Sequence, residues 1–287
     1  MAAKQAPAAA EKHEIRPGQS VELLKELHIL TRDGKLNQDS RRKLKQVYHL
    51  YQFIEPLLQQ VLTQRQQVQL VDHGAGKSYL GFILYDLFFK DAAGRQHVPG
   101  NIFGIETRSE LVQKSQELAQ RFGFDGMQFL SMSVADSIAE HSLPPQIDVV
   151  TALHACNTAT DDAIRFALEK QASHIVLAPC CQAEVAQVLR KNKAQALARG
   201  ALSELWRHPL HTREFGSQVT NVLRCLQLEA HGYQVNVTEL VGWEHSMKNE
   251  LIIASRNAGA ARGRARKRLT EILDQLGLQE LETRFFV

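Results

Sequence analysis

Residues 68–78 read VQLVDHGAGKS, a short apolar run that ends in two closely spaced glycines, Gly74 and Gly76. The run predicts a buried strand, and glycines at its end let the backbone approach a ligand with free N–H groups at the start of the next helix. A phosphate-binding P-loop needs a glycine five residues before Gly76, where this chain has Val71. A dinucleotide-binding loop needs another glycine where Tyr79 stands. The loop therefore predicts a nucleotide-like ligand that lacks a pyrophosphate.

After this loop, strand-like and helix-like patterns alternate, which predicts an α/β fold with a doubly wound, mostly parallel sheet. The candidate strands are 68–72, 101–106, 127–131, 147–153, 174–179, 233–240 and 251–255. The candidate helices are 77–89, 110–122, 133–140, 160–169, 183–189 and 217–230. Because the connection between the last two strands is too short for a crossover helix, we expect these strands to pair antiparallel. A mostly parallel sheet with an antiparallel final strand is typical of Rossmann-like class I methyltransferases.

The chain outside this sheet adds helices and a basic terminus. Apolar residues recur with helical spacing from Val21 to about Gln66, with a break at Asp33-Gly34, which predicts two N-terminal helices. The expected regions are a disordered leader (1–17), an N-terminal helical region (18–66), a methyltransferase domain (67–256) and a basic arm with a C-terminal helix (257–287). The leader lacks the apolar core of a secretory signal, and no apolar run approaches the about 20 residues of a membrane span. We therefore expect a cytoplasmic protein.

An acidic residue ends the second candidate strand, in the run Phe103-Gly-Ile-Glu106. A carboxylate at this place accepts hydrogen bonds from ribose hydroxyls. Together with the glycine loop, Glu106 predicts S-adenosylmethionine as cofactor, with Asp72 near its cationic methionine end and Asp136 within reach of the adenine. The expected cofactor-binding residues are Asp72, Gly74, Gly76, Lys77, Glu106 and Asp136. The alternative is a tight turn at the glycines with Glu106 as a solvated helix cap.

Cysteines follow the fourth and fifth candidate strands, in His154-Ala-Cys156-Asn157-Thr-Ala-Thr-Asp161 and in Pro179-Cys180-Cys181. These segments resemble a methyltransferase family with H-x-C-G-x-x-T-D and P-C-C motifs, which includes tRNA acceptor-stem 2′-O-methyltransferases and the eukaryotic glutathione-S-transferase C-terminal-domain-containing protein. The resemblance extends over residues 45–256 and includes the glycine loop and the segment 244–249. Asn157 stands where the family has glycine, and Ser246 where it has threonine. The resemblance implies methyl transfer from S-adenosylmethionine and leaves the acceptor open.

Three chemical interpretations compete for the candidate catalytic residues. The residues are His154, Cys156, Asn157, Asp161, Cys180 and Cys181. A thiolate could attack a base carbon, but the proline expected before the fourth-strand cysteine is absent. A zinc site has suitable ligand types but poor geometry, because two cysteines are adjacent and the chain has no C-x-x-C motif, so we expect no metal. We favour the third interpretation, in which His154, Asn157 and Asp161 orient the acceptor and accept its proton, while Cys180 and Cys181 shape the pocket. Buried, inert thiols are the structural alternative, and we expect this for Cys225.

The net charge of +3 is unevenly distributed. Six basic residues near the C-terminus have no acidic residue between them, and the rest of the chain carries −3. The six are Arg256, Arg262, Arg264, Arg266, Lys267 and Arg268. Because Arg alternates with Gly and Ala there, we predict a flexible cationic arm that binds RNA. A second cluster, Arg41, Arg42, Lys43 and Lys45, is interpreted as the solvated face of a helix.

The sequence therefore predicts an S-adenosylmethionine-dependent methyltransferase that acts on RNA. Two alternatives remain open: a methyltransferase of a small molecule or protein, and a cofactor-binding protein in which Asn157 has weakened catalysis. The aromatic and basic segment 206–215 lies between two expected helices, where it would form a lid, an acceptor-binding surface or a packing element. The oligomeric state is not predicted.

Overall fold

The computed structural model describes residues 15–90, 97–153, 155, 157–179, 183–191, 204–205, 207–240, 249–259 and 262–286. Its strands are β1 (Val68–His73), β2 (Gly100–Glu106), β3 (Met127–Ser131), β4 (Val149–Ala152), β5 (His174–Leu177), β6 (Tyr233–Glu239) and β7 (Glu250–Arg256). Its longer helices are α2 (Gln38–Arg65), α4 (Ser109–Phe122), α6 (Thr158–Glu169), α7 (Glu184–Lys191), α8 (Pro209–Ala230) and α9 (Arg262–Leu276). The shorter ones are α1 (Val21–Glu26), α3 (Tyr79–Leu84), α5 (Val134–Ile138) and α10 (Glu282–Phe285), with a π-helix at Tyr85–Phe89 and a 3₁₀ turn at Gln279–Leu281.

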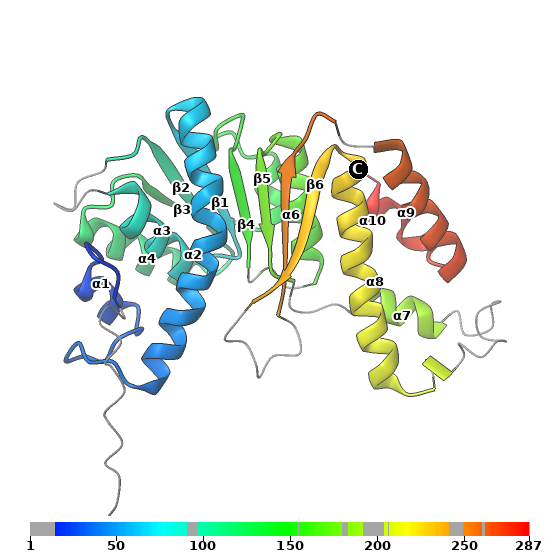
Figure 1. Cartoon of the computed structure of the whole chain (residues 1–287), viewed down its shortest axis with the longest axis horizontal. Helices are drawn as coiled ribbons and strands as arrows, with labels where there is room; N and C mark the ends of the chain where they lie inside the picture. Colours follow the sequence, from blue (N-terminus) through cyan, green and yellow to red (C-terminus); the bar gives the residue numbers. More distant parts are fainter. Residues whose placement is uncertain are drawn as a thin grey trace, which may run out of the picture.

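The strands form one sheet in the order β3-β2-β1-β4-β5-β7-β6 (Figure 1). The pairs from β3 to β5 are parallel, while β7 is antiparallel to both β5 and β6. This confirms the predicted fold class, including the antiparallel final strand. The last strand in the sequence lies inside the sheet and β6 forms the edge. We call the side where β1 to β5 end the carboxyl edge, and the side where they begin the amino edge.

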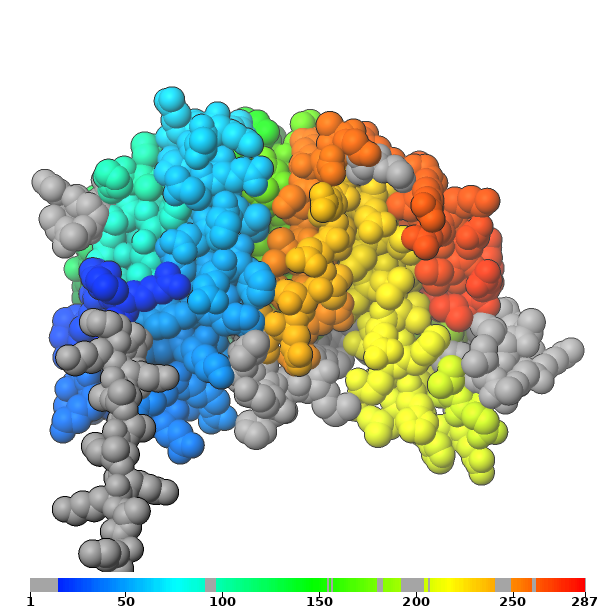
Figure 2. Space-filling view, viewed as in Figure 1, coloured from blue at the N-terminus to red at the C-terminus, as the bar shows by residue number. Residues whose placement is uncertain are grey.

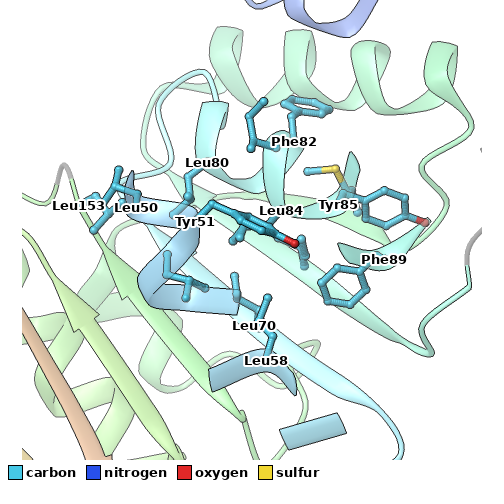
Figure 3. Close-up of a cluster of buried hydrophobic side chains, with 14 of the residues drawn as sticks. Leu50, Tyr51, Leu58, Leu70, Leu80, Phe82, Leu84, Tyr85, Phe89 and Leu153 are labelled. Carbon is cyan, nitrogen blue, oxygen red and sulfur yellow. The ribbon is translucent and has the colours of Figure 1, made fainter. Parts of the chain in front are cut away.

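Helices cover both faces of the sheet because successive strand residues point to opposite faces. On one face, Leu70 of β1 packs with α2 and α3 in the cluster of Leu and aromatic side chains in Figure 3. On the other face, Val71 packs with α6 and the end of α8, through residues such as Phe166 and Leu228. A third apolar cluster joins α7, α8 and α9. These layers hold the strands whose carboxyl ends carry the glycine loop and Glu106.

Two sequence expectations near the C-terminus are wrong. Arg262–Leu276 is a regular helix, and its buried residues Ala265, Leu269 and Leu273 pack it in one cluster with α8, so this part of the chain is not a flexible arm. Residues 209–215 are the first turns of α8 and do not connect two helices. Pro209 stands in the first helical turn, where a missing N–H costs nothing. Trp206 lies outside the described residues.

The N-terminal helices agree with the sequence pattern. The break expected at Asp33-Gly34 lies in the connection between α1 and α2, where Gly34 has a φ of +75°. Within the described part of the chain, no helix is both long and apolar enough to cross a membrane.

Candidate active site

The glycine loop joins the carboxyl end of β1 to α3 and is fastened to the end of β2. Gly74 and Gly76 have φ values of +66° and +58°, in the left-handed region that glycine adopts without strain. The N–H of Ala75 donates to the carbonyl oxygen of Ile105 at 3.0 Å, and the N–H of Gly76 donates to Glu106 Oε2 at 2.8 Å. The structure thus places the loop and the predicted ribose-binding carboxylate in direct contact.

Glu106 is a preorganised hydrogen-bond acceptor at this edge. Its side chain is only 8% exposed, and the backbone N–H of Arg108 donates to Oε1 at 3.1 Å. The Arg108 guanidinium adds two hydrogen bonds, from Nε to Oε1 at 3.0 Å and from Nη2 to Oε2 at 3.2 Å. Burial alone would raise the pKa of Glu106, but the hydrogen bonds from Arg108 and Gly76 outweigh it and hold the pKa at about 2. Glu106 is therefore an anion at neutral pH, as a ribose diol requires of its acceptor.

The sequence analysis did not single out Arg108, whose guanidinium hydrogen-bonds to the Glu106 carboxylate where the ribose would bind. Its guanidinium covers both oxygens side by side, as the two hydroxyls of a ribose would. Because the Arg108 side chain is 60% exposed, it can leave the carboxylate without disturbing the core. In the sequence, the position of this arginine two residues after the acid that ends the strand could have indicated the contact.

Asp72 lies at the carboxyl end of β1, buried against β4. The Thr151 hydroxyl donates to its Oδ1 at 2.6 Å. Burial raises the pKa of Asp72 to about 7, although the Thr151 hydrogen bond opposes this shift. The next residue, His73, is also buried, and burial lowers its pKa to about 3, so its ring is neutral at pH 7. Asp72 thus titrates near neutral pH, a property that the sequence did not indicate.

The remaining predicted cofactor residues, Asp136 and Lys77, face different surroundings. Asp136 is exposed in the first turn of α5, and its carboxylate accepts a hydrogen bond from the Ser133 hydroxyl at 2.6 Å. Lys77 lines a pocket of about 460 Å³ on the outer side of the glycine loop, between α1, α3 and α4. The structure therefore brings the glycines and Glu106 together, and it places Lys77 toward the N-terminal helices.

The segment after β4 is held by an ion pair that the sequence did not predict. Arg224 of α8 is fully buried, and its Nε and Nη2 donate to the two carboxylate oxygens of Asp161 at 2.6 and 2.9 Å. Nη2 also donates to the carbonyl oxygen of Asn157 at 3.0 Å. Both oxygens of Asp161 are thus engaged, which differs from the expectation of a proton acceptor. An arginine inside the apolar helix pattern of residues 222–228 was the signal for this pair.

Asn157 occupies an unusual backbone conformation at the start of α6, with φ +55° and ψ −124°. Asparagine tolerates the left-handed helical region, but a ψ of −124° lies outside that region, in a conformation that glycine adopts without strain. This agrees with the glycine found at this position in the family that the sequence resembles. The other expected catalytic residues, His154, Cys156, Cys180 and Cys181, lie outside the described residues, as does the segment 241–248.

The remaining cysteine, Cys225, behaves as a packing residue. It is partly buried against the core cluster around α6. Burial raises the pKa of its thiol to about 12, so the thiolate is not formed at neutral pH. This agrees with the structural role expected from the sequence.

Comparison with known proteins places the chain in a family. Residues 42–188 match a family model described as a methyltransferase domain. Because the match covers just over half of the chain, the protein belongs to this methyltransferase-domain family. It is an S-adenosylmethionine-dependent methyltransferase, as the sequence predicted. The match does not distinguish the subgroup with the H-x-C and P-C-C motifs.

Similar folds occur among solved structures of methyltransferases. An rRNA methylase from Streptococcus thermophilus has 10% identity and a TM-score of 0.43, over 71% of this chain and 95% of that chain. Magnesium protoporphyrin IX methyltransferase from Synechocystis PCC 6803, solved with bound SAH, has 15% identity and a TM-score of 0.43, over 83% of this chain and 96% of that chain. TrmK from M. capricolum, in complex with SAH, has 10% identity and a TM-score of 0.39, over 70% of this chain and 67% of that chain. No curated protein matches the sequence.

Proposed function

We propose that this enzyme transfers the methyl group of S-adenosylmethionine to RNA. The observation that carries the proposal is the charge of α9. Its first two turns expose five basic side chains, of which only Lys267 has an acidic partner within the described residues, Glu271 at 3.8 Å. Fixed cations that lack acidic partners fit a phosphate backbone, whose binding they strengthen by releasing counterions. A small-molecule methyltransferase would not need such a surface.

The residues at the carboxyl edge fit the cofactor. Ionised Glu106 would accept hydrogen bonds from the ribose hydroxyls after Arg108 moves away, and the glycine loop would let the cofactor approach the backbone. Asp72 would face the cationic amino-acid end. The cofactor supplies an electrophilic methyl group on its sulfonium, so the protein contributes mainly alignment of the acceptor. In this proposal the Arg224–Asp161 pair holds the segment that carries Asn157, and the roles of His154 in orienting the acceptor and of Cys180 and Cys181 in shaping the pocket stay predictions.

The test is methyl incorporation into RNA. The full-length protein is incubated with total RNA and S-adenosylmethionine labelled with tritium in the methyl group, and the RNA is then digested to nucleosides. We expect labelled nucleosides with the parent protein and, at a cofactor concentration below the dissociation constant of the parent, at least about tenfold less label with Glu106→Ala. Label confined to protein or small molecules, or its absence from every RNA fraction of a protein that binds S-adenosylhomocysteine, would overturn the RNA proposal.

A further inference from the structure

We infer that RNA reaches the active site over a cationic surface beside the glycine loop, and that α9 makes only a distant contact. This inference rests on the proposed RNA methylation. The surface, here called the carboxyl-edge cationic surface, consists of Arg41, Arg42 and Lys45 on α2 and of Lys77 and Lys114 in the adjoining pocket. All five side chains are exposed.

The start of α2 lies next to the glycine loop through a chain of contacts. Glu26 at the end of α1 and the first two residues of the α1–α2 connection, Leu27 and His28, line the 460 Å³ pocket together with Lys77. Lys43 in the first turns of α2 donates from Nζ to the carbonyl oxygen of His28 at 3.1 Å. The basic turns of α2 are therefore fixed beside the loop that would hold the cofactor.

The length of α2 carries these turns beyond the sheet. A helix of 28 residues is about 42 Å long, whereas the six residues of β1 span about 20 Å. The end of α2 is anchored at the amino edge, because Arg65 pairs with Asp148 at 2.6 Å just before β4 begins. The first half of α2 must then project past the carboxyl edge, as Figure 1 shows. RNA that lies across this edge would meet it.

The start of α2 and the residues just before it carry more basic than acidic side chains. Residues 31–45 contain six basic and two acidic side chains. The two acids are engaged locally, Asp33 with Lys35 and Asp39 with Lys43 and Arg42. Within the described residues, Lys45, Lys77 and Lys114 have no ion pair. Two acidic residues line the pocket: Glu26 is paired with Arg121, and Glu117 accepts a hydrogen bond from Gln113 at 3.0 Å. Lys45, Lys77 and Lys114 thus place three cationic groups without an ion pair where a phosphate backbone would pass, beside one pocket carboxylate, Glu117.

The basic turns of α9 lie at the other edge of the sheet. β7 runs antiparallel, so Arg256 at its end hydrogen-bonds through its N–H to Ser173, just before β5 begins. The guanidinium of Arg262 packs against Gly232, just before β6 begins. In Figure 2 the first turns of α9 lie at the upper right and those of α2 at the lower left. One strand length, about 20 Å, therefore separates α9 from the edge where methyl transfer occurs.

The experiment compares two matched triple variants with a fluorescein-labelled 20-base-pair RNA hairpin. Arg41→Ala/Arg42→Ala/Lys45→Ala removes three charges from α2, and Arg264→Ala/Lys267→Ala/Arg268→Ala removes three from α9. Because each phosphate contact contributes about 0.7–0.9 to the slope of log K against log salt, we expect the α2 variant to lower the slope by about 2 and the affinity at least tenfold. The α9 variant, which removes the more distant contact, should lower both the slope and the affinity less than the α2 variant does. Calorimetry with S-adenosylhomocysteine checks that both variants keep the parent affinity for the cofactor product.

Ultraviolet cross-linking of the parent protein to the same hairpin gives an independent readout. Cross-linked peptides from residues 38–45 or around Lys77 and Lys114 would support the inference. Cross-links confined to 262–268, or a larger effect of the α9 variant, would overturn it and leave RNA methylation standing. A parent protein that binds S-adenosylhomocysteine but neither binds nor methylates any RNA would overturn the proposed function itself.

Discussion

At the scale of single residues, the hydrogen bond from the N–H of Gly76 to Glu106 joins the glycine loop of β1 to the acid that ends β2. Both parts could be identified from the sequence, because each stands at a fixed place relative to a strand. Arg224 and Asp161 are 63 positions apart, and no short-range pattern connects two such residues. The raised pKa of Asp72 likewise follows from burial in the folded protein, which a motif does not contain.

Glu106→Gln is expected to weaken binding of S-adenosylhomocysteine about 10- to 100-fold, because hydrogen bonds to a charged group contribute about 1.5–3 kcal/mol. Isothermal titration calorimetry measures the change. Arg108→Gln is the matched control: Arg108 competes for the same carboxylate, so its removal should leave the affinity equal or higher. Equal affinities of Glu106→Gln and the parent protein would show that the carboxylate does not contact the ligand.

The raised pKa of Asp72 predicts that the binding of S-adenosylmethionine depends on pH. Its pKa of about 7 in the free protein lies above the ordinary value, so the carboxyl becomes protonated as the pH falls through 7 and loses its attraction for the cationic end of the cofactor. If only the ionised form binds, the dissociation constant at pH 6 should be about eightfold that at pH 7.5. Glu106 and His73, with pKa values of about 2 and 3, do not titrate in this range. Calorimetry of Asp72→Asn should give no such dependence, and a pH profile like that of the parent protein would refute the assignment.

At the scale of elements, the structure differs from the sequence expectation most clearly in α9. The Gly and Arg residues of 256–268 suggested flexibility, but Ala265, Leu269 and Leu273 recur every four residues and bury one face of a helix in the cluster with α8. The apolar repeat was short and diluted by charge, so composition outweighed periodicity. By contrast, β1 to β3 and α4 were predicted within about one residue of their bounds, because their apolar patterns are long and regular.

The buried pair between α6 and α8 should contribute strongly to stability. Arg224→Met leaves the carboxylate of Asp161 buried without a partner, which typically costs about 3–5 kcal/mol of unfolding free energy. The double variant Arg224→Met/Asp161→Leu should lose much less than the sum of the single changes, because both charges are then removed. Urea unfolding followed by circular dichroism measures both. Arg165→Met on α6, the helix that carries Asp161, is the control, since the pair of Arg165 with Glu169 is exposed and should contribute less than about 1 kcal/mol. Similar losses for Arg224→Met and Arg165→Met would contradict this role.

At the scale of the whole molecule, the direction of β7 separates the two basic clusters. The sequence predicted that the final strand runs antiparallel, and this direction alone brings its end, Arg256, to the amino edge. The position of α9 follows only from the structure. The helix packs in one cluster with α8, which keeps its basic turns at the amino edge and away from the candidate site. The basic residues at the start of α2 are solvated, as the sequence suggested, and they also project beyond the carboxyl edge because a 28-residue helix is longer than the strands of the sheet.

Hydrogen exchange should show this separation directly. A ligand suppresses the local opening of the elements it contacts, whereas elements at the other edge that open independently are unaffected. Saturating S-adenosylhomocysteine is therefore expected to slow exchange at least threefold in peptides covering 72–80 and 104–110, and to leave the α9 peptides 262–276 within error of the free protein. Mass spectrometry of the full-length protein measures this, and Glu106→Gln at the same ligand concentration is the control that should lose the protection. Equal protection of α9 would mean that the two edges open together, and α9 would then have to be regarded as part of the cofactor site's cooperative unit.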